Sequence, residues 1–170
     1  MQYKYRETVV SLIYYLRRGT NMGMVYEEIT LKNAFDVGNC TRGLIEEHEI
    51  RQTTVLALVD TGASTLVINE DLRRQLGLEV RKVREVTLAN NAKELCQVTE
   101  PVEIHWKNRE TALKALVVSG GGEVLLGALA LEDLDLIVDP TRQVLTGAHG
   151  DDVLVMLKQM DTSFASEIIL

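Results

Sequence analysis

The sequence predicts a mostly β fold, built as one compact domain with one or two short helices. Apolar and polar residues alternate in several runs after residue 24, as at Val102, Ile104 and Trp106, and this spacing is typical of half-buried strands. Only residues 69–77 carry clear start and stop signals of a helix. A chain of 170 residues with 46% hydrophobic content suits a single core.

Composition argues against several classes of function. The net charge is −7 and the pI is near 5.0, so the basic face of a nucleic-acid binder is not expected. Cys40 and Cys96 stand far apart without a nearby cysteine or histidine cluster, so we expect two reduced packing residues and neither a metal site nor a cofactor. The longest apolar run, at 9–16, is too short to cross a bilayer, and we expect a soluble, cytoplasmic chain with no membrane partner.

The chain divides into three parts by pattern. Residues 1–21 place Val9, Leu12, Ile13 and Leu16 at helical spacing, and we keep them outside the core as an N-terminal extension. A translation start at Met22 or Met24 is the alternative. Residues 22–150 form the predicted domain, and 151–170 form a tail with helical spacing.

The first half of the domain reads as strands followed by a helix. Residues 24–31 predict a strand with one buried face, 36–43 a loop, and 44–59 an acidic strand that becomes fully apolar at 55–59 and is expected to be buried on both faces. A second apolar run fills 65–68. Asn69 then provides an N-cap, acidic residues fill the first turn, and Gly77 ends the helix.

The second half reads as hairpins. Residues 85–89 and 94–98 flank Asn90 and Asn91, which tolerate the positive φ of a tight turn. A second hairpin turns at 107–109. Residues 124–127 predict a strand that ends in glycine, 128–134 one or two helical turns, and 136–145 a last hairpin.

One acidic residue stands where the apolar strand stops. Asp60 follows five apolar residues and precedes Thr61 and Gly62. An aspartate at a strand end often only begins a turn. The unbroken order of apolar strand, Asp60–Ser64, second apolar strand and capped helix favours a functional carboxylate instead, because a carboxylate is expensive to bury without a purpose.

These residues resemble the active-site motif of retroviral-type (retropepsin-like) aspartic proteases. The resemblance rests on 58–64, on 76–78 at the end of the helix, on the apolar-apolar-Gly element at 125–127 and on 136–143, and it extends over about residues 24–148. It implies a closed, acid-protease-like β-barrel as the single lobe of a subunit. It also implies an endopeptidase in which two aspartates share one proton and activate a water. Because the sequence has one such motif, the second Asp60 would come from another copy in a C2 homodimer.

The resemblance also assigns roles to neighbouring residues. Thr61 would bind across the dimer axis, Gly62 would bring backbone N–H groups to the carboxylate, and Ala63 would line the cleft for a peptide or protein substrate. The hairpin tip would close over the peptide as a flap. The expected substrate-binding residues are Ala63, Ala89, Asn90, Asn91, Leu126 and Gly127. The tip departs from the Ala-Asp-Gly of bacterial relatives, which leaves a plain surface turn as an alternative.

Three alternatives stay open at this point. The chain could be a non-catalytic dimerisation or peptide-binding module of the same fold, or an unrelated β-barrel interaction protein in which Asp60 only makes a turn. The tail from Asp151 could cover the subunit's own core or join the dimer interface through 168–170.

Overall fold

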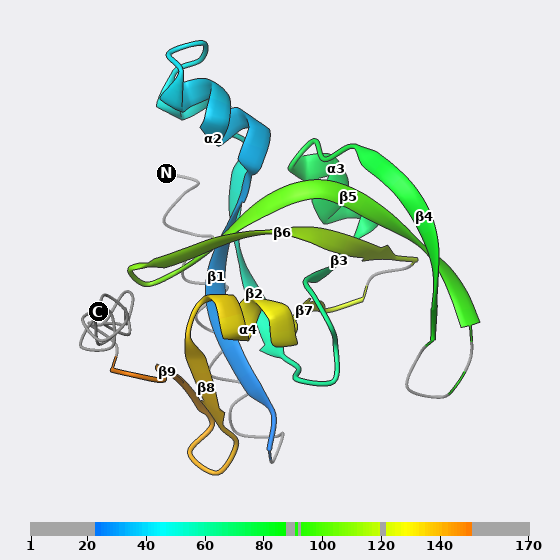
Figure 1. The fold of residues 1–170 in the computed structure, drawn as a ribbon, viewed down its shortest axis with the longest axis vertical. Coiled ribbons are helices and arrows are strands. Elements are labelled where there is room, and N and C mark those ends of the chain that lie inside the picture. Colours follow the sequence, from blue (N-terminus) through cyan, green and yellow to red (C-terminus); the bar gives the residue numbers. More distant parts are fainter. Residues whose placement is uncertain (1–22, 88–90, 92, 120–121, 151–170) are drawn as a thin grey trace, which may run out of the picture.

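Six strands form a closed ring, which confirms the predicted β-barrel (Figure 1). The computed structural model describes residues 23–87, 91, 93–119 and 122–150. The order around the ring is β1 (Val25–Asn33), β2 (Gln52–Val59), β7 (Val124–Leu126), β3 (Val67–Asn69), β6 (Arg109–Val118) and β5 (Lys93–Trp106), and β5 pairs again with β1. Within the ring, each of the six strands has a hydrogen-bonded neighbour on both sides.

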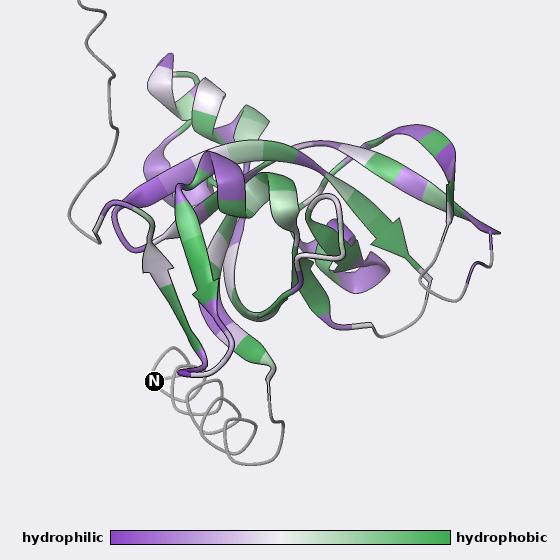
Figure 2. Ribbon diagram, turned by 60° about the horizontal axis from the view of Figure 1, so that its bottom comes forward, coloured by the Kyte–Doolittle hydropathy of each residue, from purple (hydrophilic) through white to green (hydrophobic). Residues whose placement is uncertain are grey.

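The seventh strand of the sheet lies outside the ring. β4 (Val80–Thr87) pairs antiparallel with β5, from Val80 opposite Thr99 to Thr87 opposite Lys93. This hairpin extends away from the barrel at the right of Figure 1. Hydrophobic and hydrophilic residues alternate along it in Figure 2. The predicted hairpin is therefore confirmed, with longer strands than the sequence indicated.

The barrel interior holds the core. Alternate residues are buried along the second half of β5, as predicted for Val102, Ile104 and Trp106, because successive side chains point to opposite faces of a strand. The fully buried large side chains are Trp106, Ile29, Leu31, Leu66, Ile68, Leu76, Leu78, Ile104, Leu126, Leu134, Val25 and Val102.

The prediction that residues 55–59 are buried on both faces is wrong in part. Ala57 and Val59 are buried, whereas Val55, Leu56 and Leu58 are only half-buried. β2 is a barrel strand, so one of its faces lies outside the ring. An apolar side chain on that outer face cannot be buried by the barrel core and depends on other parts of the protein or on a ligand for burial.

Two of the helices agree with the sequence. α3 (Glu70–Gln75) begins at Asn69, whose side chain accepts a hydrogen bond of 2.9 Å from the amide of Leu72, and Gly77 follows it with φ +60°. α4 (Ala128–Asp133) follows β7 and leads into a separate hairpin of β8 (Leu136–Asp139) and β9 (Val144–Gly147). Both the helical turns at 128–134 and the last hairpin were predicted.

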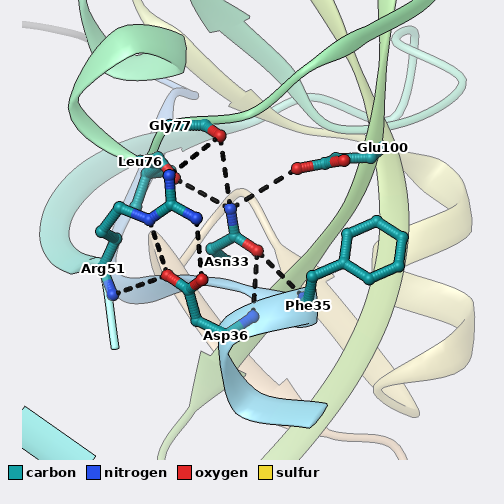
Figure 3. Close-up of polar contacts among 7 residues, drawn as sticks. All are labelled: Asn33, Phe35, Asp36, Arg51, Leu76, Gly77 and Glu100. Carbon is teal, nitrogen blue, oxygen red and sulfur yellow. Dashed lines mark hydrogen bonds and ion pairs between the residues drawn. The ribbon is translucent and has the colours of Figure 1, made fainter. Parts of the chain in front are cut away.

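A third helix replaces the loop that was predicted at 36–43. α2 (Ala34–Thr41) and the short 3-10 helix η1 (Glu47–Glu49) lie between β1 and β2, so the acidic strand expected from residue 44 begins only at Gln52. Asn33 starts α2 because its Oδ1 accepts hydrogen bonds from the amides of Phe35 and Asp36, at 2.9 and 3.2 Å (Figure 3). Glycine and asparagine within the segment concealed this helix from sequence reasoning.

The remaining predictions concern the two ends of the chain, the two cysteines and the membrane. The N-terminal extension (1–21) and the C-terminal tail (151–170) lie outside the described residues, so the division at 22 and 150 stays a prediction. Cys40 and Cys96 are both free thiols, and Cys96 is buried. No helix in the described part of the chain is long and apolar enough to cross a membrane.

Candidate active site

Asp60 lies directly beyond the end of β2, at a place fixed by two backbone hydrogen bonds. Its amide donates to the carbonyl oxygen of Leu126 at 3.0 Å, and its carbonyl oxygen accepts from the amide of Ala63 at 3.1 Å. The first bond continues the parallel pairing of β2 with β7, where Val59 lies opposite Leu126. The half-buried carboxyl of Asp60 therefore stands on a rigid strand end, with a tight turn after it.

The turn supplies a donor to this carboxyl. The amide of Gly62 donates a hydrogen bond of 2.9 Å to Oδ1 of Asp60. A Cβ at position 62 would lie 3.1 Å from the same oxygen, so a side chain there would crowd it. Thr61 and Gly62 are exposed, and Ala63 is half-buried. The geometry agrees with the expectation that the Gly62 backbone orients the carboxylate.

The loop after Asp60 also caps helix α4. No side chain caps α4, which begins after Gly127. Its first two amides, those of Ala128 and Leu129, instead donate to the carbonyl oxygens of Ala63 and Ser64 at 2.8 and 3.2 Å. These bonds satisfy amides that would otherwise lack partners at the helix start. Loop and helix thus hold each other in place.

Gly127 has to be glycine because the loop backbone passes against it. A Cβ at this position would lie 2.3 Å from the carbonyl oxygen of Thr65 and 2.7 Å from that of Ala63. No side chain fits at that separation. These distances and the hydrogen bond from Asp60 to Leu126 place the end of β7 and Gly127 directly against the Asp60 loop.

The expected contact between Leu126 and a substrate needs correction. Its side chain is completely buried and lies in the core under the loop. Leu126 supports Asp60 through its backbone carbonyl instead. The backbone of 126–127 faces the loop, and the Leu126 side chain faces the core.

The flap tip is described at one position only. Asn91, between β4 and β5, has φ +63°, the left-handed geometry that was predicted for this turn. Ala89 and Asn90 lie outside the described residues. The structure thus brings together Asp60, Thr61, Gly62, Ala63, Leu126 and Gly127 in one loop cluster, and leaves the substrate contacts of the flap as a prediction.

Sequence reasoning missed two further contributions to this region. The hydroxyl of Thr65 donates to the carbonyl oxygen of Lys114 at 3.0 Å and so ties the end of the loop to β6. The hydroxyl of Tyr26, on β1, donates to the Glu123 carboxylate, which precedes β7. Nothing in the spacing of these residues signalled contacts across 49 and 97 positions.

The chemistry available at the site is that of carboxylates. Within the residues that the structure describes, no group of three or more histidine, cysteine, aspartate or glutamate side chains is arranged to hold a metal ion. Asp60 offers a half-buried carboxyl that accepts one backbone hydrogen bond. A carboxyl of this kind can act as a general acid or base when a second carboxyl shares its proton.

Comparison with known proteins agrees with this arrangement. The family model of the gag-polyprotein putative aspartyl protease matches residues 47–133, about half of the chain. The match runs from η1 to the end of α4 and includes the Asp60 loop, the flap hairpin and β7. No curated protein matches the chain.

Many solved structures are similar to the chain, and three of them serve as examples. EIAV protease in complex with the inhibitor HBY-793 is 26% identical, with 48% of this chain and 78% of the other covered and a TM-score of 0.40. The retroviral protease-like domain of Ddi1 from Leishmania major is 15% identical (76% and 90% covered, TM-score 0.47). A retropepsin-like aspartic protease from Rickettsia conorii is 19% identical (68% and 87% covered, TM-score 0.39). With the family model matched over the Asp60 loop and the closed barrel around it, the chain belongs to the retropepsin-like gag-polyprotein aspartyl protease family.

Proposed function

We propose that this protein is an aspartic endopeptidase that hydrolyses peptide bonds with Asp60 as its catalytic residue. The observation that carries the proposal is the Asp60 carboxyl itself: it stands at a strand end, its backbone is held by Leu126, and its Oδ1 accepts the Gly62 amide. An aspartate that only began a turn would not need the tight glycine contact beneath its loop. Family membership supports the same reading.

The active form in this proposal is a C2 homodimer. Aspartic protease chemistry needs two carboxyls in contact, and the sequence has a single Asp-Thr-Gly motif. A two-fold axis at the Asp60 loop brings the same residue from both copies together. Thr61 is exposed beside Asp60, where it can contact its symmetry mate across the axis.

The reaction follows from the shared proton. Two adjacent carboxyls hold one proton between them, since two like charges in contact cannot both ionise cheaply. The ionised carboxylate takes a proton from a water, which attacks the scissile carbonyl, while the protonated carboxyl donates a hydrogen bond to the developing oxyanion. Proton transfer to the leaving nitrogen then breaks the C–N bond. The amide of Gly62 keeps the carboxyl in position throughout.

The surroundings complete the proposal. Ala63 would line the cleft, the backbone at Gly127 would border it, and the flap with Ala89, Asn90 and Asn91 would cover the peptide and exclude water. Both described cysteines are free, in keeping with a cytoplasmic, reducing environment.

The test compares Asp60→Asn with a matched control. Asp139 also ends a strand, and its Oδ1 accepts hydrogen bonds from the amides of Thr141 and Arg142. Asp139→Asn therefore removes one charge from the same kind of turn. We expect the wild type and Asp139→Asn to cleave an unfolded protein or a mixed peptide library between about pH 4 and pH 7, and Asp60→Asn to be inactive.

Light scattering on the same samples reports the assembly. A dimer that cleaves in the wild type and is intact but inactive in Asp60→Asn supports one aspartate from each copy. A folded wild type that cleaves nothing would reject the endopeptidase and favour a dimerisation or peptide-binding module. Activity that survives in Asp60→Asn would reject Asp60 as the catalytic residue.

A further inference from the structure

Four apolar residues lie side by side in a row across the strands next to Asp60; Tyr26 and Val67 are buried, whereas Leu58 and Leu125 are half-buried. Tyr26 lies opposite Leu58, Leu58 opposite Leu125, and Leu125 opposite Val67. Four strands, β1, β2, β7 and β3, thus contribute one residue each at the same level. The neighbours in sequence, such as Ala57 and Leu126, point into the core, so strand alternation directs the row outward.

A carboxylate lies at this row. Glu123 precedes Leu125 by two positions and is exposed. The hydroxyl of Tyr26 donates to both of its carboxylate oxygens, at 3.2 Å to Oε1 and 3.3 Å to Oε2. Tyr26 is only 6% exposed, so it is a fixed anchor for this contact. The Glu123 carboxylate is therefore held beside the apolar row.

The row adjoins the catalytic carboxyl. Leu58 precedes Asp60 by two positions, and the bond from the Asp60 amide to Leu126 continues the pairing of β2 with β7, so alternation is expected to send both side chains to the same side. Leu125 precedes Leu126, whose carbonyl oxygen accepts the Asp60 amide. Leu58 and Leu125 are half-buried and can still be covered by a ligand. Under the proposed function, a peptide bound for attack at Asp60 is expected close to Leu58 and Leu125.

We propose that the row selects a lysine or arginine side chain of the substrate, an inference that rests on the endopeptidase function proposed above. The aliphatic stem of the basic residue packs on Leu58 and Leu125, and its charged end reaches the carboxylate of Glu123 beside Tyr26. Long basic side chains bind in this way, with apolar contact along the stem and a polar contact at the tip. The net charge of −7 also favours the approach of basic peptides.

The proposed dimer presents the row twice. A two-fold axis at Asp60 puts one Glu123 on each side of the scissile bond. The specificity is therefore expected on both sides of the bond, at positions related by the symmetry.

The experiment uses peptides that differ at one position. A cleaved library sequence supplies the frame, and lysine, norleucine or glutamate is placed at the position next to the scissile bond. Norleucine keeps the length of lysine and removes the charge. Cleavage is measured as kcat/KM with the wild type, and binding by fluorescence anisotropy in the Asp60→Asn background, which needs no catalysis. If no library sequence is cleaved, a peptide captured by Asp60→Asn serves as the frame.

Glu123→Gln is the test variant, and Glu110→Gln is the control. Glu110 lies at the start of β6, with its side chain 74% exposed, so its substitution removes the same charge elsewhere. We expect the wild type to prefer lysine over norleucine by about tenfold, Glu110→Gln to keep this ratio, and Glu123→Gln to bring it close to one. Tyr26→Phe tests the positioning of Glu123, and its expected effect is a smaller loss of the same lysine-to-norleucine ratio than in Glu123→Gln.

The outcomes separate the two proposals. Equal kcat/KM for lysine and norleucine in an active wild type overturns the basic specificity and leaves the protease function intact, as does an unchanged lysine preference in Glu123→Gln. Tighter binding of the lysine peptide that depends on Glu123, in a protein that cleaves nothing, supports the specificity and rejects the protease function. If no peptide is bound and none is cleaved, the basic specificity and the endopeptidase function are both rejected.

Discussion

Nδ2 of Asn33 donates a hydrogen bond of 3.1 Å to the carbonyl oxygen of Leu76, 43 positions later in the chain (Figure 3). Asn33 is completely buried at the end of β1, and its Oδ1 caps α2 at the same time. One side chain therefore joins the end of a barrel strand, the inserted helix and the end of α3. Glu100, also buried, lies 3.5 Å from the same nitrogen.

Asn33→Asp should destabilise the protein although it keeps the helix cap. The substitution replaces the only donor group of the side chain with a second carboxylate oxygen, which then faces the carbonyl of Leu76 and the carboxylate of Glu100. A buried charge without a partner is costly, and we expect a loss of at least about 2 kcal/mol in the free energy of unfolding. Urea unfolding at one fixed protein concentration measures it, with the exposed Asn108→Asp as a control that should change little.

The ion pair of Asp36 and Arg51 should make stability depend on pH in acid. Nε and Nη2 of Arg51 each lie 2.7 Å from a carboxylate oxygen of Asp36, in a bidentate pair. The hydrogen bonds from Arg51 lower the pKa of Asp36 against the opposing effect of burial. Because the folded pKa lies below the unfolded one, the stabilisation is complete above the ordinary pKa of aspartate, about 4, and is lost as the pH falls through the folded pKa.

Asp36→Asn tests this dependence. We expect it to lower the free energy of unfolding by about 1–3 kcal/mol at pH 7, and the difference from the wild type to shrink below about pH 4. Glu70 on α3 forms a similar ion pair but is more exposed than Asp36. Hydrogen bonds from Arg73 lower the pKa of Glu70 to about 2. A difference between wild type and Asp36→Asn that is the same at pH 3 and pH 7 would contradict the ion-pair explanation.

The sequence predicted the elements that depend on local patterns. Asn69 and Gly77 mark the ends of α3, and the order of apolar strands around Asp60 indicated both the barrel and the motif. These features depend on residues within a few positions of each other, where helix caps and strand alternation act. The left-handed φ of Asn91 belongs to the same class.

The features that sequence reasoning missed depend on distant partners. α2 contains one glycine and one asparagine and has a weak helix propensity, yet Asn33 caps it and Arg51, just before β2, binds Asp36. The cap of α4 comes from the backbone of the Asp60 loop, which no side-chain pattern reveals. Tertiary contacts therefore determine that α2 forms and how α4 is capped.

Arg109→Lys should weaken the junction between the barrel and the last hairpin. Arg109 is 4% exposed, and its Nη1 donates to the carbonyl oxygen of Leu134 at 2.7 Å and to the Asp135 side chain at 3.1 Å, while Nη2 donates to Gly150 at 2.7 Å. A single ammonium cannot reach acceptors on both sides of this span. We expect a loss of about 2–4 kcal/mol in unfolding free energy, measured in urea, whereas Arg142→Lys on the exposed turn should be neutral. Equal stability of the two variants would contradict the proposed role of the Arg109 guanidinium in joining these acceptors.

Gly127→Ala should lower activity strongly without touching a catalytic side chain. The new methyl group would lie 2.3 Å from the carbonyl oxygen of Thr65, so the loop or α4 has to move. The Asp60 amide is bonded to the adjacent Leu126, and a displacement there misplaces the carboxyl. We expect kcat/KM to fall about a hundredfold and the free energy of unfolding to fall by about 1–3 kcal/mol.

Gly38→Ala is the matched control for this effect. Gly38 lies within α2, and no atom lies within 4 Å of a Cβ built there. Alanine should stabilise the helix by up to about 1 kcal/mol and leave proteolysis unchanged, because α2 packs mainly on β1, β5 and η1 and supplies no partner to the loop bonds described above. If Gly127→Ala and Gly38→Ala had the same activity, the loop would tolerate a side chain under Asp60, and the tight approach of β7 would not be what positions the carboxyl.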